Sequence, residues 1–127
     1  MKRFGYGIVV GIALAGAIAQ AQDSLVGTYT GAYSASSPTG NTRQNGVKLV
    51  IDSAENGVVR GTATLDTGGP CSGNYAMAGK LAGGRLIMRS TRQSGAAGDC
   101  PFGLNVAMEG NKLVGSTGGG YPIQLSK

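Results

Sequence analysis

The chain has 127 residues, with 11 basic and 6 acidic side chains, 24 glycines, two cysteines, no histidine and no tryptophan. Without histidine it lacks the side chain most often used for proton transfer at neutral pH and for binding transition metals. The six carboxylates are scattered, with no spacing that pairs them for catalysis or clusters them around a metal ion. We therefore expect no enzyme, no metal site and no cofactor.

The first 21 residues have the form of a secretory signal peptide. A basic start is followed by an apolar run at residues 4–19, and Ala19-Gln20-Ala21 has the small-x-small pattern that signal peptidase cleaves. The run is shorter than the roughly 20 residues that span a bilayer, and no charged stop-transfer segment follows it. The sequence predicts a cleaved leader at residues 1–21 and one exported domain at residues 22–127, periplasmic or extracellular, with no membrane insertion after cleavage.

The exported part carries only a small positive charge. Once Lys2 and Arg3 are removed, nine basic residues remain against six acidic ones, which gives a net charge of +3. The basic residues are spread over several segments, whereas nucleic-acid binding needs them gathered on one face. We expect no nucleic-acid partner.

Cys71 and Cys100 are the only cysteines. In an exported chain two cysteines most simply form one intramolecular disulfide, because the compartments outside the cytoplasm are oxidising. Closing a loop of about 30 residues removes unfolded-state entropy worth roughly 3.5 kcal/mol. The disulfide should therefore supply a large share of the stability of a domain of this size.

Apolar residues alternate with polar or small ones along most of the exported part, as in strands with one buried face. In the segment 100–108, for example, Phe102, Leu104 and Val106 fall on one face. The expected strands are Leu25–Tyr33, Val47–Asp52, Val58–Asp66, Cys71–Leu81, Arg85–Arg92, Cys100–Met108, Lys112–Gly118 and Tyr121–Ser126. Eight strands in this order favour an all-β fold, an eight-stranded antiparallel up-and-down barrel, because closure removes exposed sheet edges. An open sandwich is the alternative.

The connections between these strands are unequal. In up-and-down order, the tight turns at 54–57, 82–84 and 109–111 lie at one end. The connections at 34–46, 67–70, 93–99 and 119–120 lie at the other end, which also holds both cysteines. Because the strands that follow the two cysteines are second neighbours, about 9.6 Å apart, the chain must bend to form the disulfide.

Gly27-Thr28-Tyr29, in the first expected strand, stands where lipocalins and avidin-like proteins have Gly-x-Trp. With eight antiparallel strands and one loop-rich end, the chain resembles these small calycin-type β-barrels. It departs from them in having no tryptophan, and nothing in it matches the biotin-contacting pattern of avidins. The resemblance implies the architecture of the exported part and no ligand.

Four aromatic residues are expected to point inward near the loop-rich end, namely Tyr33, Tyr75, Phe102 and Tyr121. Such rings could floor a shallow pocket for a small apolar or aromatic ligand. The alternative is that they fill the barrel, with each hydroxyl bonded to a nearby carbonyl.

Arg92 continues the inward alternation of its strand. An inward guanidinium could pair with Asp99 or meet an anionic group of a ligand. A solvated arginine at the end of a strand is the alternative.

These features favour a non-catalytic binding module that captures a small molecule or a partner protein at the loop-rich end, because binding residues concentrate on loops carried by a rigid scaffold. Two alternatives stay open. One is an enzyme inhibitor or immunity-type protein acting through the 34–46 loop, and the other is a structural or adhesive envelope protein. The sequence leaves the oligomeric state undetermined.

Overall fold

The computed structural model describes residues 25–36, 40–94 and 100–127. The expected leader, the loop segments 37–39 and 95–99, and the side chains of residues 36 and 92–94 lie outside the described part. Among the described residues, no helix is long and apolar enough to cross a membrane.

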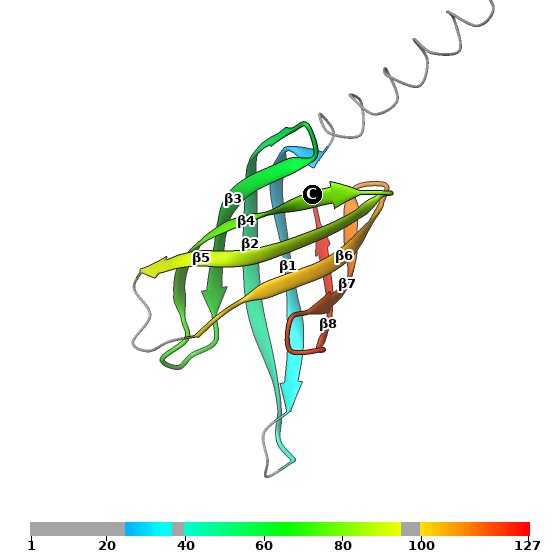
Figure 1. Cartoon of the computed structure of the whole chain (residues 1–127). Coiled ribbons are helices and arrows are strands. Elements are labelled where there is room, and N and C mark those ends of the chain that lie inside the picture. The colour runs from blue at the N-terminus through cyan, green and yellow to red at the C-terminus, as the bar shows by residue number, and fades with distance from the viewer. Residues whose placement is uncertain (1–24, 37–39, 95–99) are drawn as a thin grey trace, which may run out of the picture.

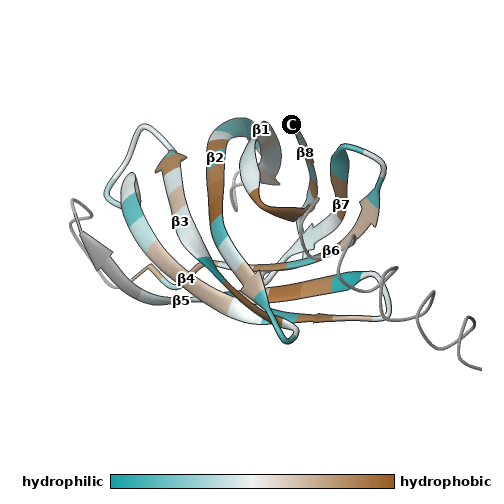
Figure 2. Cartoon of the chain, turned by 90° about the horizontal axis from the view of Figure 1, so that it is seen from above, coloured by the Kyte–Doolittle hydropathy of each residue, from teal (hydrophilic) through white to brown (hydrophobic). Residues whose placement is uncertain are grey.

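Eight antiparallel strands form a closed barrel (Figures 1 and 2). The strands are β1 (Gly27–Ser36), β2 (Thr42–Glu55), β3 (Val58–Asp66), β4 (Gly73–Ala82), β5 (Arg85–Ser94), β6 (Gly103–Glu109), β7 (Lys112–Thr117) and β8 (Pro122–Ser126). Each strand pairs with the next, and β8 pairs with β1 to close the ring. The predicted up-and-down barrel is confirmed and the open sandwich is excluded.

The period-two alternation of the sequence becomes an inner and an outer face. In β3 the residues Val59, Gly61, Ala63 and Leu65 are buried, and every residue between them is exposed. Bands of hydrophobic and hydrophilic residues accordingly follow one another along the strands in Figure 2. The inner residues of all eight strands meet in one hydrophobic core inside the barrel.

Four of the strand glycines serve the tight curvature of this small barrel. At four strand positions an added Cβ would lie 2.0–2.2 Å from a backbone carbonyl oxygen of the neighbouring strand. These positions are Gly31, Gly61, Gly79 and Gly115. Only a residue without a side chain lets the strands coil this closely.

Two bulges interrupt the alternation. The register of β2 with β3 shifts between Ile51 and Ser53, and the register of β4 with β5 passes from Met77–Ser90 directly to Ala76–Arg92. Each shift leaves one extra residue, Asp52 or Thr91, on the bulged strand. Beyond a bulge, sequence parity no longer predicts which face a residue occupies.

The end of the barrel that holds the tight turns, in the upper part of Figure 1, is closed by short hairpins. Asn56 and Gly57 have φ values of 56° and 78°, the left-handed pair that a type I′ turn requires. Leu25 is fully buried at this end, and the Tyr29 hydroxyl donates a 2.7 Å hydrogen bond to its carbonyl oxygen. The ammonium group of Lys127 lies 5.6 Å from the centre of the Tyr29 ring, within cation–π range.

The disulfide joins Cys71 and Cys100 at the opposite end, as predicted, with their Cα atoms 5.6 Å apart. This is well below the spacing of second-neighbour strands. The bend is possible because neither cysteine lies in a strand: β4 begins at Gly73 and β6 at Gly103, two and three residues later than expected. The disulfide indicates an oxidising compartment outside the cytoplasm.

The predicted loop 34–46 is wrong in extent, because β1 and β2 continue through most of it. Ser34, Ala35 and Ser36 pair with Gln44, Arg43 and Thr42. Pairing of β1 with β8 ends at Tyr33, and pairing of β2 with β3 ends at Gly46. This part of the hairpin therefore projects beyond the barrel (Figure 1). We call residues 34–36 and 42–44 the β1–β2 arm. Its polar sequence carries no buried face, and strand prediction from apolar alternation therefore misses it.

Candidate functional site

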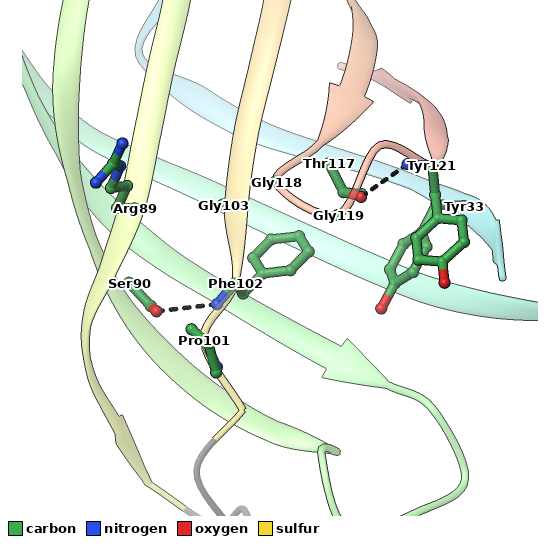
Figure 3. Close-up of a pocket in the computed structure, with 10 residues that line it drawn as sticks. All are labelled: Tyr33, Arg89, Ser90, Pro101, Phe102, Gly103, Thr117, Gly118, Gly119 and Tyr121. Carbon is green, nitrogen blue, oxygen red and sulfur yellow. Dashed lines mark hydrogen bonds between the residues drawn. The ribbon is translucent and has the colours of Figure 1, made fainter.

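A pocket of about 580 Å³ opens at the long-loop end (Figure 3). It is lined by Tyr33, Arg89, Ser90, Pro101, Phe102, Gly103, Thr117, Gly118, Gly119 and Tyr121. Three of the five predicted site residues, Tyr33, Phe102 and Tyr121, are therefore brought together in it. Tyr75 lies deeper, fully buried beside Phe102, and the side chain of Arg92 lies outside the described residues.

The aromatic rings form a continuous row across this end of the barrel. Tyr33 lies in the middle, with ring centroids 6.2 Å from Tyr121 and 6.1 Å from Phe102. Phe102 in turn lies 6.2 Å from Tyr75. These separations lie within the range of favourable aromatic pairs, so the row forms an apolar wall with some rigidity of its own.

The tyrosine hydroxyls divide into two kinds. The Tyr75 hydroxyl donates a 2.6 Å hydrogen bond to the carbonyl oxygen of Cys71, so this residue follows the packing alternative. Burial raises the pKa of Tyr75 above its ordinary value, and the nearby Tyr33 raises it further. The hydroxyls of Tyr33 and Tyr121, in contrast, have no hydrogen-bond partner among the described residues. Tyr33 is half-buried and Tyr121 is 36% exposed.

Two short side chains fix the backbone that carries the rings. Where the β5–β6 register ends at Arg89 and Gly103, the Ser90 hydroxyl accepts a 3.0 Å hydrogen bond from the Phe102 amide. The Thr117 hydroxyl accepts a 3.2 Å bond from the Tyr121 amide in the same way. Both contacts are drawn in Figure 3. They position two of the rings although both ring residues lie just outside their strands.

Glycines provide the space in front of this wall. The backbones of Gly103 and Gly118 are joined by a hydrogen bond, in which the Gly118 amide donates to the Gly103 carbonyl oxygen at 2.8 Å. A Cβ at Gly119 would lie only 3.3 Å from the Tyr121 ring. Side chains at these positions would occupy the volume that the pocket now leaves open.

Arg89 is the one charged residue among those lining the pocket. It is exposed, and in Figure 3 its guanidinium is directed away from the three rings. For Arg92, the other arginine considered, the register places its backbone opposite Ala76 beyond the Thr91 bulge. The inward parity expected for Arg92 rested on an alternation that this bulge interrupts. Among the described residues, the aromatic part of the pocket therefore carries no charged group beside its rings.

Asn45 is a polar residue of this end that the sequence pattern of aromatic and charged residues does not indicate. It lies on β2 opposite Tyr33, is only 6% exposed, and its Oδ1 has no hydrogen-bond partner within the described part of the chain. Extending the alternation of Val47 and Leu49 two residues backward would have placed it inside. Its missing partner is a tertiary property that sequence does not reveal.

No group of three or more metal-ligating side chains occurs among the residues that the structure covers. Comparison of the chain with protein-family models, curated proteins and solved structures gives no match. What the pocket can do must therefore be argued from its own geometry, which offers apolar contact to a flat molecule and a few polar atoms.

Proposed function

We propose that the domain is an exported, non-catalytic binding module of calycin type, which takes a small uncharged aromatic or apolar molecule at its long-loop end. The observation that carries the proposal is the row of rings along a 580 Å³ pocket, with the Tyr33 and Tyr121 hydroxyls unused. Apolar walls with a few convergent polar groups are typical of small-molecule sites. Binding rather than catalysis is favoured because the described lining residues include no acid–base pair.

Export supports this assignment. The signal-peptide pattern at residues 1–21 and the Cys71–Cys100 disulfide both favour the periplasm or the exterior of the cell. A domain outside the cytoplasm that captures a small molecule needs a scaffold that stays folded without its ligand. A closed barrel with a buried core meets this need.

The test is a fluorescence titration of the domain with 2-naphthol, a flat uncharged probe. Saturable binding is expected, and the double substitution Tyr33→Ala with Tyr121→Ala should weaken it at least tenfold, because two of the three rings that line the pocket are removed. Ile87→Ala is the matched control, since Ile87 is a large apolar residue that is 47% exposed and does not line the pocket. Absence of saturable binding, or equal binding by the double variant, would contradict the proposal.

The second candidate is a protein inhibitor or immunity-type protein acting through the hairpin between β1 and β2. The favouring observation is the β1–β2 arm, which projects beyond the barrel and exposes Thr42, Arg43 and Gln44. Replacing residues 36–42 by Asn-Gly would close the hairpin at the Ala35–Arg43 pair with a two-residue turn. A small-molecule binder should retain its affinity for 2-naphthol after this change, whereas an inhibitor should lose its protein target.

A structural or adhesive role through strand edges has less support. The ring closes between β1 and β8, so the described barrel offers free edges only in short stretches such as the arm. Sedimentation at high protein concentration tests this role, since a strictly monomeric domain would contradict it.

A further inference from the structure

Asn45 is a buried polar residue whose side-chain oxygen forms no hydrogen bond within the described part of the fold. It is 94% buried, and its Oδ1 accepts no hydrogen bond from any described residue. A buried acceptor without a donor destabilises a folded protein, and such groups are rare enough that each calls for a reason. A leucine at this position would extend the inner face formed by Val47 and Leu49 without that penalty.

The strand register places Asn45 beside Tyr33, which lines the pocket. Around the ring of strands the order is β8, β1 and β2, and Tyr33 of β1 lies directly opposite Asn45 of β2. On its other side Tyr33 contacts Tyr121, which precedes β8 and lines the pocket. Asn45 itself does not line the pocket, so a molecule reaches its amide only by extending past the Tyr33 ring.

Other polar groups at this end are already engaged. The Tyr75 hydroxyl donates to Cys71, and the hydroxyls of Ser90 and Thr117 accept from backbone amides. Within the described part of this end, the acceptor at Asn45 and the hydroxyls of Tyr33 and Tyr121 are still without a protein partner. Because a carbonyl oxygen only accepts, its missing partner must be an N–H or O–H donor.

We propose that the ligand is an uncharged planar molecule carrying an N–H or O–H group, which packs on Tyr33 and Phe102 and donates its hydrogen bond to Oδ1 of Asn45. This inference rests on the proposed function and adds the chemical class of the ligand. Asn45 is then the residue that determines specificity, because a ligand without a donor leaves the acceptor unpaired. An anionic ligand is disfavoured, since Arg89, the one charged residue among the described lining residues, points away from the rings.

Three probes with the same bicyclic ring test the inference. 2-Naphthol has an O–H donor, 2-methoxynaphthalene has none, and 2-naphthoate is an anion. The wild-type domain should bind 2-naphthol about tenfold more tightly than 2-methoxynaphthalene, the factor expected for one hydrogen bond to a buried group. 2-Naphthoate should bind most weakly.

Asn45→Leu gives the matched variant. It should weaken 2-naphthol about tenfold, leave 2-methoxynaphthalene within a factor of two and so remove the difference between them. The melting temperature of the free domain should rise, because the variant lacks the unpaired acceptor. A residue that merely supports the fold would show the opposite, with a lower melting temperature and both probes weakened alike.

A measurement on the unaltered domain keeps the test independent of whether the variant folds. With asparagine side-chain carbonyls labelled with ¹³C, the Asn45 resonance should move downfield on saturation with 2-naphthol and stay in place with 2-methoxynaphthalene. Equal affinities for these two probes, or an unmoved Asn45 resonance, would refute the inference and leave the proposed function standing. If none of the three probes binds, the proposed function itself fails.

Discussion

The two ends of the barrel close in different ways. At the tight-turn end Leu25 is fully buried, and the Tyr29 hydroxyl is bonded to its carbonyl oxygen. At the long-loop end Tyr75 makes the same kind of contact, to the carbonyl four residues earlier in the chain, at Cys71. There the similarity ends, because the long-loop end also holds two tyrosine hydroxyls and one buried amide oxygen without partners among the described residues.

This difference shows at which end of the barrel the described polar groups find their partners within the chain. The tight-turn end is stabilised by a hydrogen bond between residues close in the chain and by the buried side chain of Leu25. The long-loop end carries the disulfide between Cys71 and Cys100 and, among the described residues, leaves the buried Oδ1 of Asn45 unpaired. The buried acceptor of Asn45 is a cost to stability that a bound hydrogen-bond donor can offset.

Removal of the disulfide should destabilise the long-loop end more than any other change. Replacing both Cys71 and Cys100 by serine should lower the free energy of unfolding by roughly 3.5 kcal/mol, because the unfolded chain regains the freedom of a loop with a 29-residue separation. Urea unfolding followed by circular dichroism measures this. A loss below about 1 kcal/mol would mean that the strands hold this end without the disulfide.

Removing apolar side chains at each end should give a smaller but more contrasted result. Leu25→Ala should cost about 3 kcal/mol, because it leaves a cavity at a fully buried position. Tyr121→Ala should change stability by no more than about 0.5 kcal/mol, since Tyr121 lies outside the strands and is 36% exposed. Equal costs in the same unfolding experiment would show that both ends are packed alike.

The smallest expected effect concerns the tyrosines that are bonded at each end. Burial raises the pKa of both Tyr29 and Tyr75 above the ordinary value of 10.0. The folded state then holds these protons more tightly than the unfolded chain, so the stabilisation is full below pH 10 and is lost as the pH rises above it. Unfolding midpoints measured between pH 8 and about pH 11 should fall across the upper part of this range.

Phenylalanine variants sharpen that measurement. Tyr75→Phe should cost about 1 kcal/mol at neutral pH, the usual value of one hydrogen bond, and should flatten the alkaline decrease. Tyr33→Phe is the control, because its hydroxyl has no partner in the described part and no bond would be lost. An unchanged alkaline profile in Tyr75→Phe would contradict the role given to its burial.

The sequence predicts the barrel well because most strands bury one face. The alternation of Val59, Gly61, Ala63 and Leu65 identifies β3 to the residue. The β1–β2 arm escapes prediction because both of its faces are polar, and the bulges at Asp52 and Thr91 escape it because alternation carries no information on register.

The sequence predicts part of the site, because alternation along a strand indicates which residues point inward. Tyr33 and Phe102 follow the inward parity of their strands, and Tyr121 reaches the pocket from just outside its own strand. Parity does not distinguish a ring that fills the core, as Tyr75 does, from one that faces a pocket. Nor can it show that Asn45 lacks a partner, since hydrogen bonding depends on which strands the fold brings together.

The closure of the ring has a consequence for assembly. β1 and β8 are joined by only four residue pairs, from Thr30–Ser126 to Tyr33–Ile123, and those partners are separated by nearly the whole described chain. Contacts between such distant segments form late in folding because the intervening chain must be ordered first. Until β8 pairs with its neighbours, β1 and β7 each present an unpaired edge to other chains. The rate of this last pairing step therefore determines how long a newly made molecule is exposed to aggregation.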